Sequence, residues 1–79
     1  MSMRTNKKAL GPETLAERVR FAKRCRQFRE SQTMTDQDLA TILGCTLFTI
    51  RNWERGLTTP HHDAMENFLI VEQILKDEL

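Results

Sequence analysis

Hydrophobic residues recur at helical spacing in four stretches of the chain. The inward face of the first stretch consists of residues three or four positions apart: Leu15, Val19, Ala22, Cys25 and Phe28. Most lysines and arginines of this stretch fall on the opposite face. Pro12 or Glu13 suits the first turn of a helix, and the pattern breaks after Ser31. The first predicted helix therefore begins at Pro12 or Glu13 and ends near Ser31.

Two short helices follow, joined by a tight turn. Thr35 is the expected cap of the helix from Asp36 to Leu43, which places Leu39, Ala40 and Leu43 inward and ends at Gly44. Thr46 caps the next predicted helix, from Leu47 to about Arg55. The inner face of that helix is Ile50 and Trp53, and Gly56 ends it.

The last predicted helix opens at Pro60, with Thr59 as its expected cap, and runs from His61 to about Lys76. Its apolar stripe is broad: Ala64, Met65, Phe68, Leu69, Val71, Ile74 and Leu75. We expect Met65, Phe68, Leu69 and Glu72 to cover the core. Ile70, Val71, Ile74 and Leu75 are then left over, which predicts a homodimer surface unless the long first helix covers them. No stretch alternates as a strand would, so the predicted fold is all-α.

Length and composition narrow the class of protein. A chain of 79 residues can build one small core, so we expect a single domain over residues 12–79. The longest apolar run, Phe68 to Val71, is far shorter than a membrane span, which favours a cytoplasmic protein with no membrane partner. We predict no cofactor, no catalytic residues and no metal. His61 and His62 are adjacent but have no partner at ligand spacing.

The low number of cysteines also favours a cytoplasmic protein. Cys25 and Cys45 are too few for a disulfide scaffold and are expected to be buried thiols. A redox pair would need close Cα atoms, which the sequence does not show.

Charge is unevenly distributed along the chain. Residues 1–30 hold nine lysines and arginines against three glutamates, a net charge of +6, whereas residues 31–79 hold three against eight acids, a net charge of −5. The basic half either faces a polyanion or is an ordinary solvated surface. Residues 1–11 lack periodicity and are predicted to form a flexible basic arm carrying Arg4, Lys7 and Lys8. Such an arm is either disordered or reaches into a DNA groove.

The two short helices and their turn have the dimensions of a helix-turn-helix, which places its second helix in the DNA major groove. The residues that carry a family resemblance are Phe28-Arg29, Met34-Thr35, Leu39-Ala40, Leu43-Gly44-Cys45-Thr46, Ile50, Trp53-Glu54-Arg55-Gly56 and Pro60. With this pattern, over about residues 26–70, the chain resembles the phage-repressor (Cro/Xre-type) helix-turn-helix family. The resemblance implies a compact lambda-repressor-like domain of four to five helices with its motif at about 35–55. It also implies a DNA-binding repressor that binds a palindromic operator as a dimer.

The resemblance also implies roles for individual residues. The positions that face bases are Leu47, Phe48, Arg51 and Asn52, and those that contact the DNA backbone are Thr35, Thr46, Arg55, Thr58 and Thr59. Arg29 and Glu54 match a pair that forms an internal ion pair in relatives.

The chain departs from the family pattern at three places. Leu47 and Phe48 are apolar where relatives carry polar base readers, so they contact thymine methyl groups, bind a protein, or are buried. Asp36 and Asp38 bring negative charge near the expected phosphate path. Thr33 stands where relatives often have glycine. These departures keep two alternatives open: a protein-interaction module, or the antitoxin of a toxin–antitoxin pair.

Overall fold

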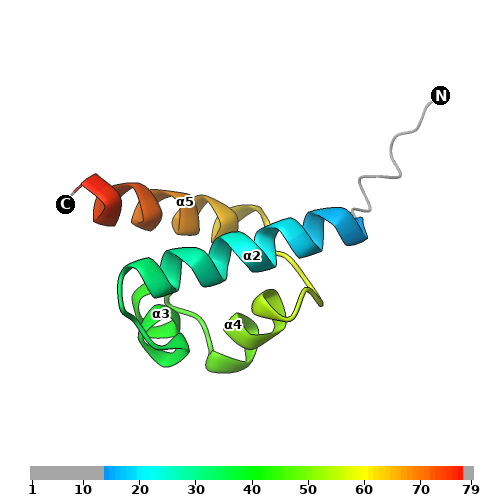
Figure 1. Ribbon diagram of the computed structural model, residues 1–79, viewed down its shortest axis with the longest axis horizontal. Coiled ribbons are helices and arrows are strands. Elements are labelled where there is room, and N and C mark those ends of the chain that lie inside the picture. Colours follow the sequence, from blue (N-terminus) through cyan, green and yellow to red (C-terminus); the bar gives the residue numbers. More distant parts are fainter. Residues whose placement is uncertain (1–13, 78–79) are drawn as a thin grey trace.

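The computed structural model describes residues 14–77, and these residues are all-α (Figure 1). Four helices follow one another: α2 (Leu15–Ser31), α3 (Asp36–Leu43), α4 (Leu47–Glu54) and α5 (His62–Asp77). All four predicted helices are thus confirmed, with ends that agree to within a residue or two where both can be compared. The predicted arm at residues 1–11 and the predicted first-helix start at Pro12 or Glu13 lie outside the described residues.

Threonine side chains cap the first three of these helices. The Thr35 hydroxyl accepts from the Asp38 amide at 3.0 Å, and the Asp38 carboxylate accepts from the Thr35 amide at 3.1 Å. Thr46 accepts from the Thr49 amide at 3.1 Å. The predicted caps at Thr35 and Thr46 are confirmed, whereas α5 begins at His62, so Thr59 does not directly precede it as a cap would. Thr14 forms a further capping box with Glu17, so helix α2 itself begins at Leu15.

Positive backbone φ angles mark the turns between the helices. Gly44 has φ +73° at the end of α3, and Gly56 has φ +77° after α4, which are conformations that glycine adopts without steric cost. Thr33 lies in the same left-handed region with φ +56°. A β-branched residue is strained there, so the turn between α2 and α3 is made at a cost that glycine would avoid.

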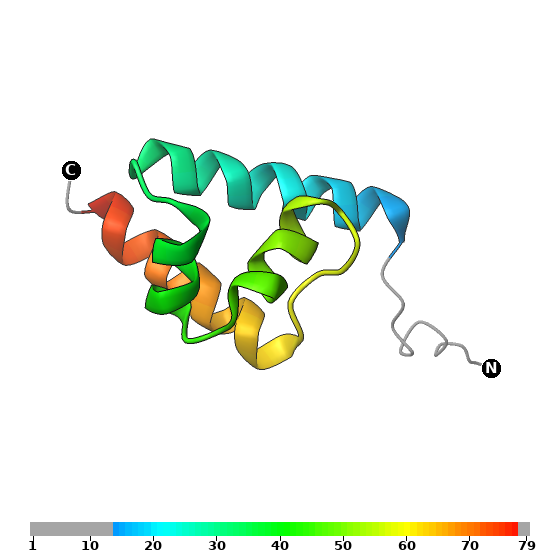
Figure 2. The same ribbon diagram turned by 90° about the horizontal axis from the view of Figure 1, so that it is seen from below.

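Helix α2 runs along the length of the described fold, with α3 and α4 on one side of it and α5 on another (Figure 1). Seen from below, α3 and α4 lie in front, and α5 runs in the same general direction as α2 (Figure 2). Within residues 14–77, no helix has the length and apolar character needed to cross a membrane.

All four helices contribute to one core. Its buried members are Phe21, Ala22, Cys25, Phe28, Leu39, Ala40, Leu43, Ile50, Trp53 and Phe68. Phe68 of α5 lies between two rings of α2, with centroid distances of 5.0 Å to Phe21 and 5.7 Å to Phe28. Phe21 also meets Trp53 of α4 edge to face at 5.7 Å. These edge-to-face contacts join α2, α4 and α5 around a single aromatic cluster.

The expected inward face of α2 is wrong at its start. Leu15 and Val19 are 64% and 51% exposed, whereas Phe21, which the pattern left out, is buried. Each residue of a helix advances about 100° around the axis. By this rule Val19 lies about 60° outside the stripe that the buried residues of α2 define. Leu15 falls close to that stripe, but it is the first residue of α2 and its side chain is left uncovered.

The division of the α5 stripe also needs correction. Phe68 and Glu72 are buried and Met65 packs against the core, as expected. Val71 and Leu75, expected to be left over, pack against the core as well. Leu69, expected in the core, is exposed together with Ile70 and Ile74. The apolar surplus of α5 is therefore Leu69, Ile70 and Ile74.

An ion pair joins α5 to α2 beside this core. Both carboxylate oxygens of Glu72 accept from Arg24, Oε1 from Nη2 at 2.6 Å and Oε2 from Nε at 3.1 Å. Lys76 Nζ lies 3.7 Å from Oε2. The hydrogen bond from Arg24 is the main cause that lowers the pKa of Glu72 below its ordinary value of 4.5, against the opposing effect of burial. Glu72 is therefore ionised in the folded protein at neutral pH.

This ion pair predicts an acid-dependent stability. The unfolded chain binds a proton at Glu72 at a higher pH than the folded protein does, so the pair's contribution is present above about pH 4.5 and is lost as the pH falls through the lowered pKa. We expect the urea midpoint of wild type to fall on acidification and that of Glu72→Gln to fall less steeply. Equal slopes for the two proteins between about pH 3 and 7 would contradict this assignment.

Candidate nucleic-acid interface

Helices α3 and α4 are held in a fixed relation by the turn between them. The Gly44 amide donates to Thr41 O at 3.3 Å and the Cys45 amide to Ala40 O at 3.0 Å, which satisfies carbonyl groups at the end of α3. Leu39, Ala40 and Ile50 are fully buried between the helices. The small side chain of Ala40 lets the two helices approach closely. The result is a rigid helix–turn–helix unit.

The outer face of α4 carries the four residues predicted to contact bases. Ile50 and Trp53 are buried on the inner side, and Leu47, Asn52 and Thr49 are partly exposed. Arg51 is exposed, and Phe48 is 72% exposed. Because positions three and four apart share a helix face, Phe48, Arg51 and Asn52 lie on the same side of α4. The alternative that Phe48 is an ordinary buried residue is therefore wrong.

Arg51 is not free on this face. Its Nε donates to Oδ2 of Asp36, the first residue of α3, at 3.3 Å. The sequence led to separate expectations for these two residues, a base reader at Arg51 and a source of repulsion at Asp36. No pattern along the chain pairs them, because they are joined only by the crossing of α3 and α4.

The residues predicted to contact the DNA backbone lie at helix ends and in the α4–α5 loop. Thr35 and Thr46 are exposed, and their hydroxyl oxygens accept from helix amides as caps. Arg55, the C-cap of α4, is exposed, as is Thr58, whereas Thr59 is partly buried. Thr35 and Thr46 thus mark two helix N-termini whose amides can receive an anion. Arg55 and the loop lie at the far end of α4.

Arg29 and Glu54 form the internal ion pair that the resemblance implied. Arg29 Nε donates to Glu54 Oε2 at 2.8 Å and Nη2 to Oε1 at 3.0 Å, a two-pronged contact. Arg29 Nη1 also donates to Met34 O at 3.3 Å. The two charged side chains are only 21% and 13% exposed. The pair ties α2 to the end of α4 and to the turn before α3.

Two further arginines of α2 contact the same end of α4, and no pattern in the sequence predicted these contacts. Arg26 Nη2 donates to the backbone oxygen of Glu54 at 2.6 Å, and Arg18 Nε donates to that of Gly56 at 3.1 Å. Cations at a helix C-terminus interact favourably with the negative end of the helix dipole. Much of the positive charge of α2 is therefore used to hold α4 in place. Arg20 and Lys23 of α2 are exposed.

The Cys25 thiol belongs to the same cluster. Its Sγ donates to Glu54 Oε2 at 3.6 Å, and the residue is fully buried. Burial, with a smaller effect from the Glu54 charge, raises the pKa of Cys25 to about 12. Burial also raises the pKa of Cys45, which packs partly buried against the core. Both residues are free thiols, and at neutral pH they are poor nucleophiles.

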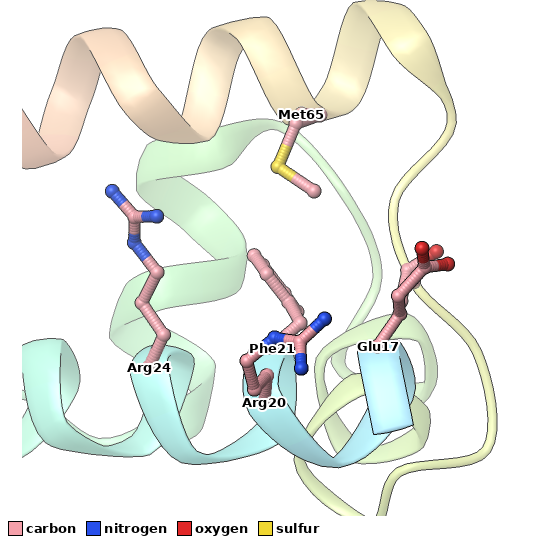
Figure 3. A pocket seen from close by; sticks show the side chains of 6 residues that line it. Glu17, Arg20, Phe21, Arg24 and Met65 are labelled. Atoms are coloured by element: carbon pink, nitrogen blue, oxygen red, sulfur yellow. The ribbon is translucent and has the colours of Figure 1, made fainter. Parts of the chain in front are cut away.

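A groove of about 460 Å³ lies between α2 and the start of α5. Its lining residues are Glu17, Arg20, Phe21, Arg24, Thr59 and Met65 (Figure 3). Met65 points from α5 toward α2 above the Phe21 ring (Figure 3). The predicted base-contacting residues lie elsewhere, on α4, and the groove is not part of that face.

One group of described residues could hold a metal ion by proximity alone. Ligand atoms of His62, Asp63 and Glu66 lie within 4.8 Å of one another in the first turns of α5. All three residues are exposed, and exposed groups of this kind are common without an ion. We therefore assign no metal to them.

No protein-family model matches this chain, and comparisons with curated proteins and with solved structures give no match either.

Proposed function

We propose that this protein is a sequence-specific DNA-binding regulator of the Cro/Xre type that reads the major groove with α4. The observation that carries the proposal is the outer face of α4. Polar and aromatic side chains stand exposed there, on a helix whose inner side is fixed by Ile50 and Trp53 and whose end is fixed through Glu54. A rigid exposed helix of this kind, preceded by a second helix and a tight turn, is suited to the major groove.

Base reading follows from the chemistry of this face. The guanidinium group of Arg51 can donate twice to guanine, and the amide of Asn52 can donate to and accept from adenine. Phe48 and Leu47 offer apolar surface for thymine methyl groups. The specificity of the protein is proposed to come from these four residues.

Phosphate contacts are proposed on both sides of α4. The N-termini of α3 and α4, with Thr35 and Thr46, offer amides and hydroxyl groups to one stretch of backbone. Arg55, Thr58 and Thr59 offer contacts to another. Asp36 and Asp38 oppose these contacts by charge repulsion, so we expect general DNA affinity to be moderate.

The proposed active form is a dimer that represses by occluding a palindromic operator. The support is an exposed apolar group on α5, formed by Leu69, Ile70 and Ile74. A chain of this size rarely leaves such a group exposed to water without a partner. We propose that a dimer formed through α5 places its two copies of α4 in successive major grooves on one side of the duplex. The half-sites would then lie about 34 Å apart, one helical turn.

A second candidate is a protein-interaction module, with an antitoxin as one variant. The observation that favours it is the 72% exposure of Phe48 at the start of α4. An exposed aromatic ring on a rigid helix is a common protein anchor. In this case the same face of α4 would bind a protein rather than DNA.

Selection of bound fragments from the source genome, followed by salt titration, separates the two candidates. For the regulator we expect a palindromic motif and an affinity that falls steeply as salt rises, because phosphate contacts release counterions. A folded protein that enriches no motif contradicts the regulator. Such a result directs the search to a protein partner, whose apolar contact with Phe48 would depend little on salt.

A further inference from the structure

We infer that Asp36 is the positioning residue that orients Arg51 for base reading, and so determines specificity at one operator position. The inference rests on the proposed function, since it concerns how the same face of α4 discriminates between bases. Its physical basis is the contact between Arg51 Nε and Asp36 Oδ2 across the two helices.

The atoms used in this contact leave the reading end of Arg51 available. A guanidinium group has five N–H donors, and only the single one on Nε is directed to Asp36. Among the residues that the structure describes, the Arg51 side chain makes no other hydrogen bond or ion pair. Recognition of guanine requires two parallel donors, which Nη1 and Nη2 can supply. The contact therefore holds the guanidinium group at Nε and leaves Nη1 and Nη2 available to a guanine.

Asp36 itself is well held. It is the first residue of α3, where the helix dipole favours a negative charge. The capping box is formed by Thr35 and Asp38, so the Asp36 carboxylate takes no part in it. Its helix is anchored by Leu39 and Ala40, which are fully buried. Arg51 is thus attached to a fixed carboxylate on a second rigid element.

Two opposing effects on DNA binding follow from this position. Holding Arg51 in one orientation reduces the side-chain freedom that is lost when it binds a base, which sharpens the preference for guanine. The Asp36 charge near the phosphate path weakens binding to every sequence. Removal of Asp36 should therefore tighten general binding while it weakens discrimination at one position. A residue with only a structural role would not produce this combination.

The test compares Asp36→Ala with a matched control, Asp38→Asn. Both variants remove one negative charge from the first turn of α3, but Asp38 does not touch Arg51, and asparagine keeps an acceptor for the Thr35 amide. The position that Arg51 reads is identified as the one where Arg51→Ala loses base preference. Dissociation constants are then measured for the operator with each of the four bases at that position. Asp36→Asn provides a second variant if Asp36→Ala does not fold.

We expect wild type to prefer guanine there by about tenfold. Asp36→Ala should reduce this preference to about twofold, while Asp38→Asn keeps it, and both should bind random DNA more tightly than wild type does. The inference is overturned if Asp36→Ala retains or sharpens the preference, because Asp36 would then only compete with DNA for Arg51. Failure of the proposed function has a different signature: wild type selects no motif, or Arg51→Ala alters no preference, and the inference falls with it.

Discussion

Glu54→Ala should lower the free energy of unfolding by about 3 kcal/mol, a large part of the stability of a chain this size. The Glu54 carboxylate accepts two hydrogen bonds from Arg29 and one from Cys25. Its removal leaves the guanidinium group of Arg29 largely shielded from water and without its counter-charge. The effect is read from urea unfolding, followed by the fluorescence of Trp53, the single tryptophan of the chain.

Two companion variants identify the cause of this loss. Glu54→Gln keeps the shape and the acceptor but not the charge, so we expect a smaller loss than for alanine. The double variant Arg29→Ala/Glu54→Ala should lose less unfolding free energy than the sum of the losses in the two single variants, because it leaves no charge unpaired. Strict additivity, or an unchanged urea midpoint for Glu54→Ala, would show that this contact does not hold α4 in place.

Arg51→Ala/Asn52→Ala should reduce affinity for the selected operator by about a hundredfold, because each residue is expected to make a base contact worth about 1–3 kcal/mol. Arg51 is exposed and Asn52 partly so, and the Asn52 backbone oxygen still accepts from the Leu57 amide. We therefore expect stability to change by less than about 0.5 kcal/mol. Fluorescence anisotropy with labelled operator and with a scrambled duplex measures the specific loss.

Lys23→Ala is the matched control for this variant. Like the double variant, it removes one positive charge, here from an exposed position of α2. Its effect on operator and scrambled DNA should be small and equal. If Lys23→Ala weakens operator binding as much as the double variant does, the contribution of Arg51 is general charge and not base reading.

The local features of the fold were predictable from the sequence because they depend on neighbours along the chain. The caps at Thr35 and Thr46, the left-handed turn at Gly44 and the buried Ile50 and Trp53 all follow from residues within one helical turn. The expected inner face of α2 failed at Leu15 and Val19. That failure arose because periodicity shows that a helix has an apolar side but not where the neighbouring helices end.

Contacts between helices were harder to predict. The pairing of Arg29 with Glu54 came from a resemblance, whereas the contacts of Arg26 and Arg18 with the end of α4 were not anticipated at all. The acceptors there are backbone oxygens, which carry no sequence signal. The contact between Asp36 and Arg51 was not predicted for a related reason. The two residues are 15 positions apart, and only the crossing of two helices brings them together. Predicting it requires the angle between α3 and α4.

Chemical-shift mapping by nuclear magnetic resonance tests most directly whether α4 is the surface that contacts DNA. Isotope-labelled protein is titrated with the selected operator duplex, and each backbone amide is followed. We predict the largest shifts at residues 46–52 and at the first turn of α3, with smaller shifts in the α4–α5 loop. Unchanged amides throughout α4, with shifts confined to α2 or α5, would contradict the account.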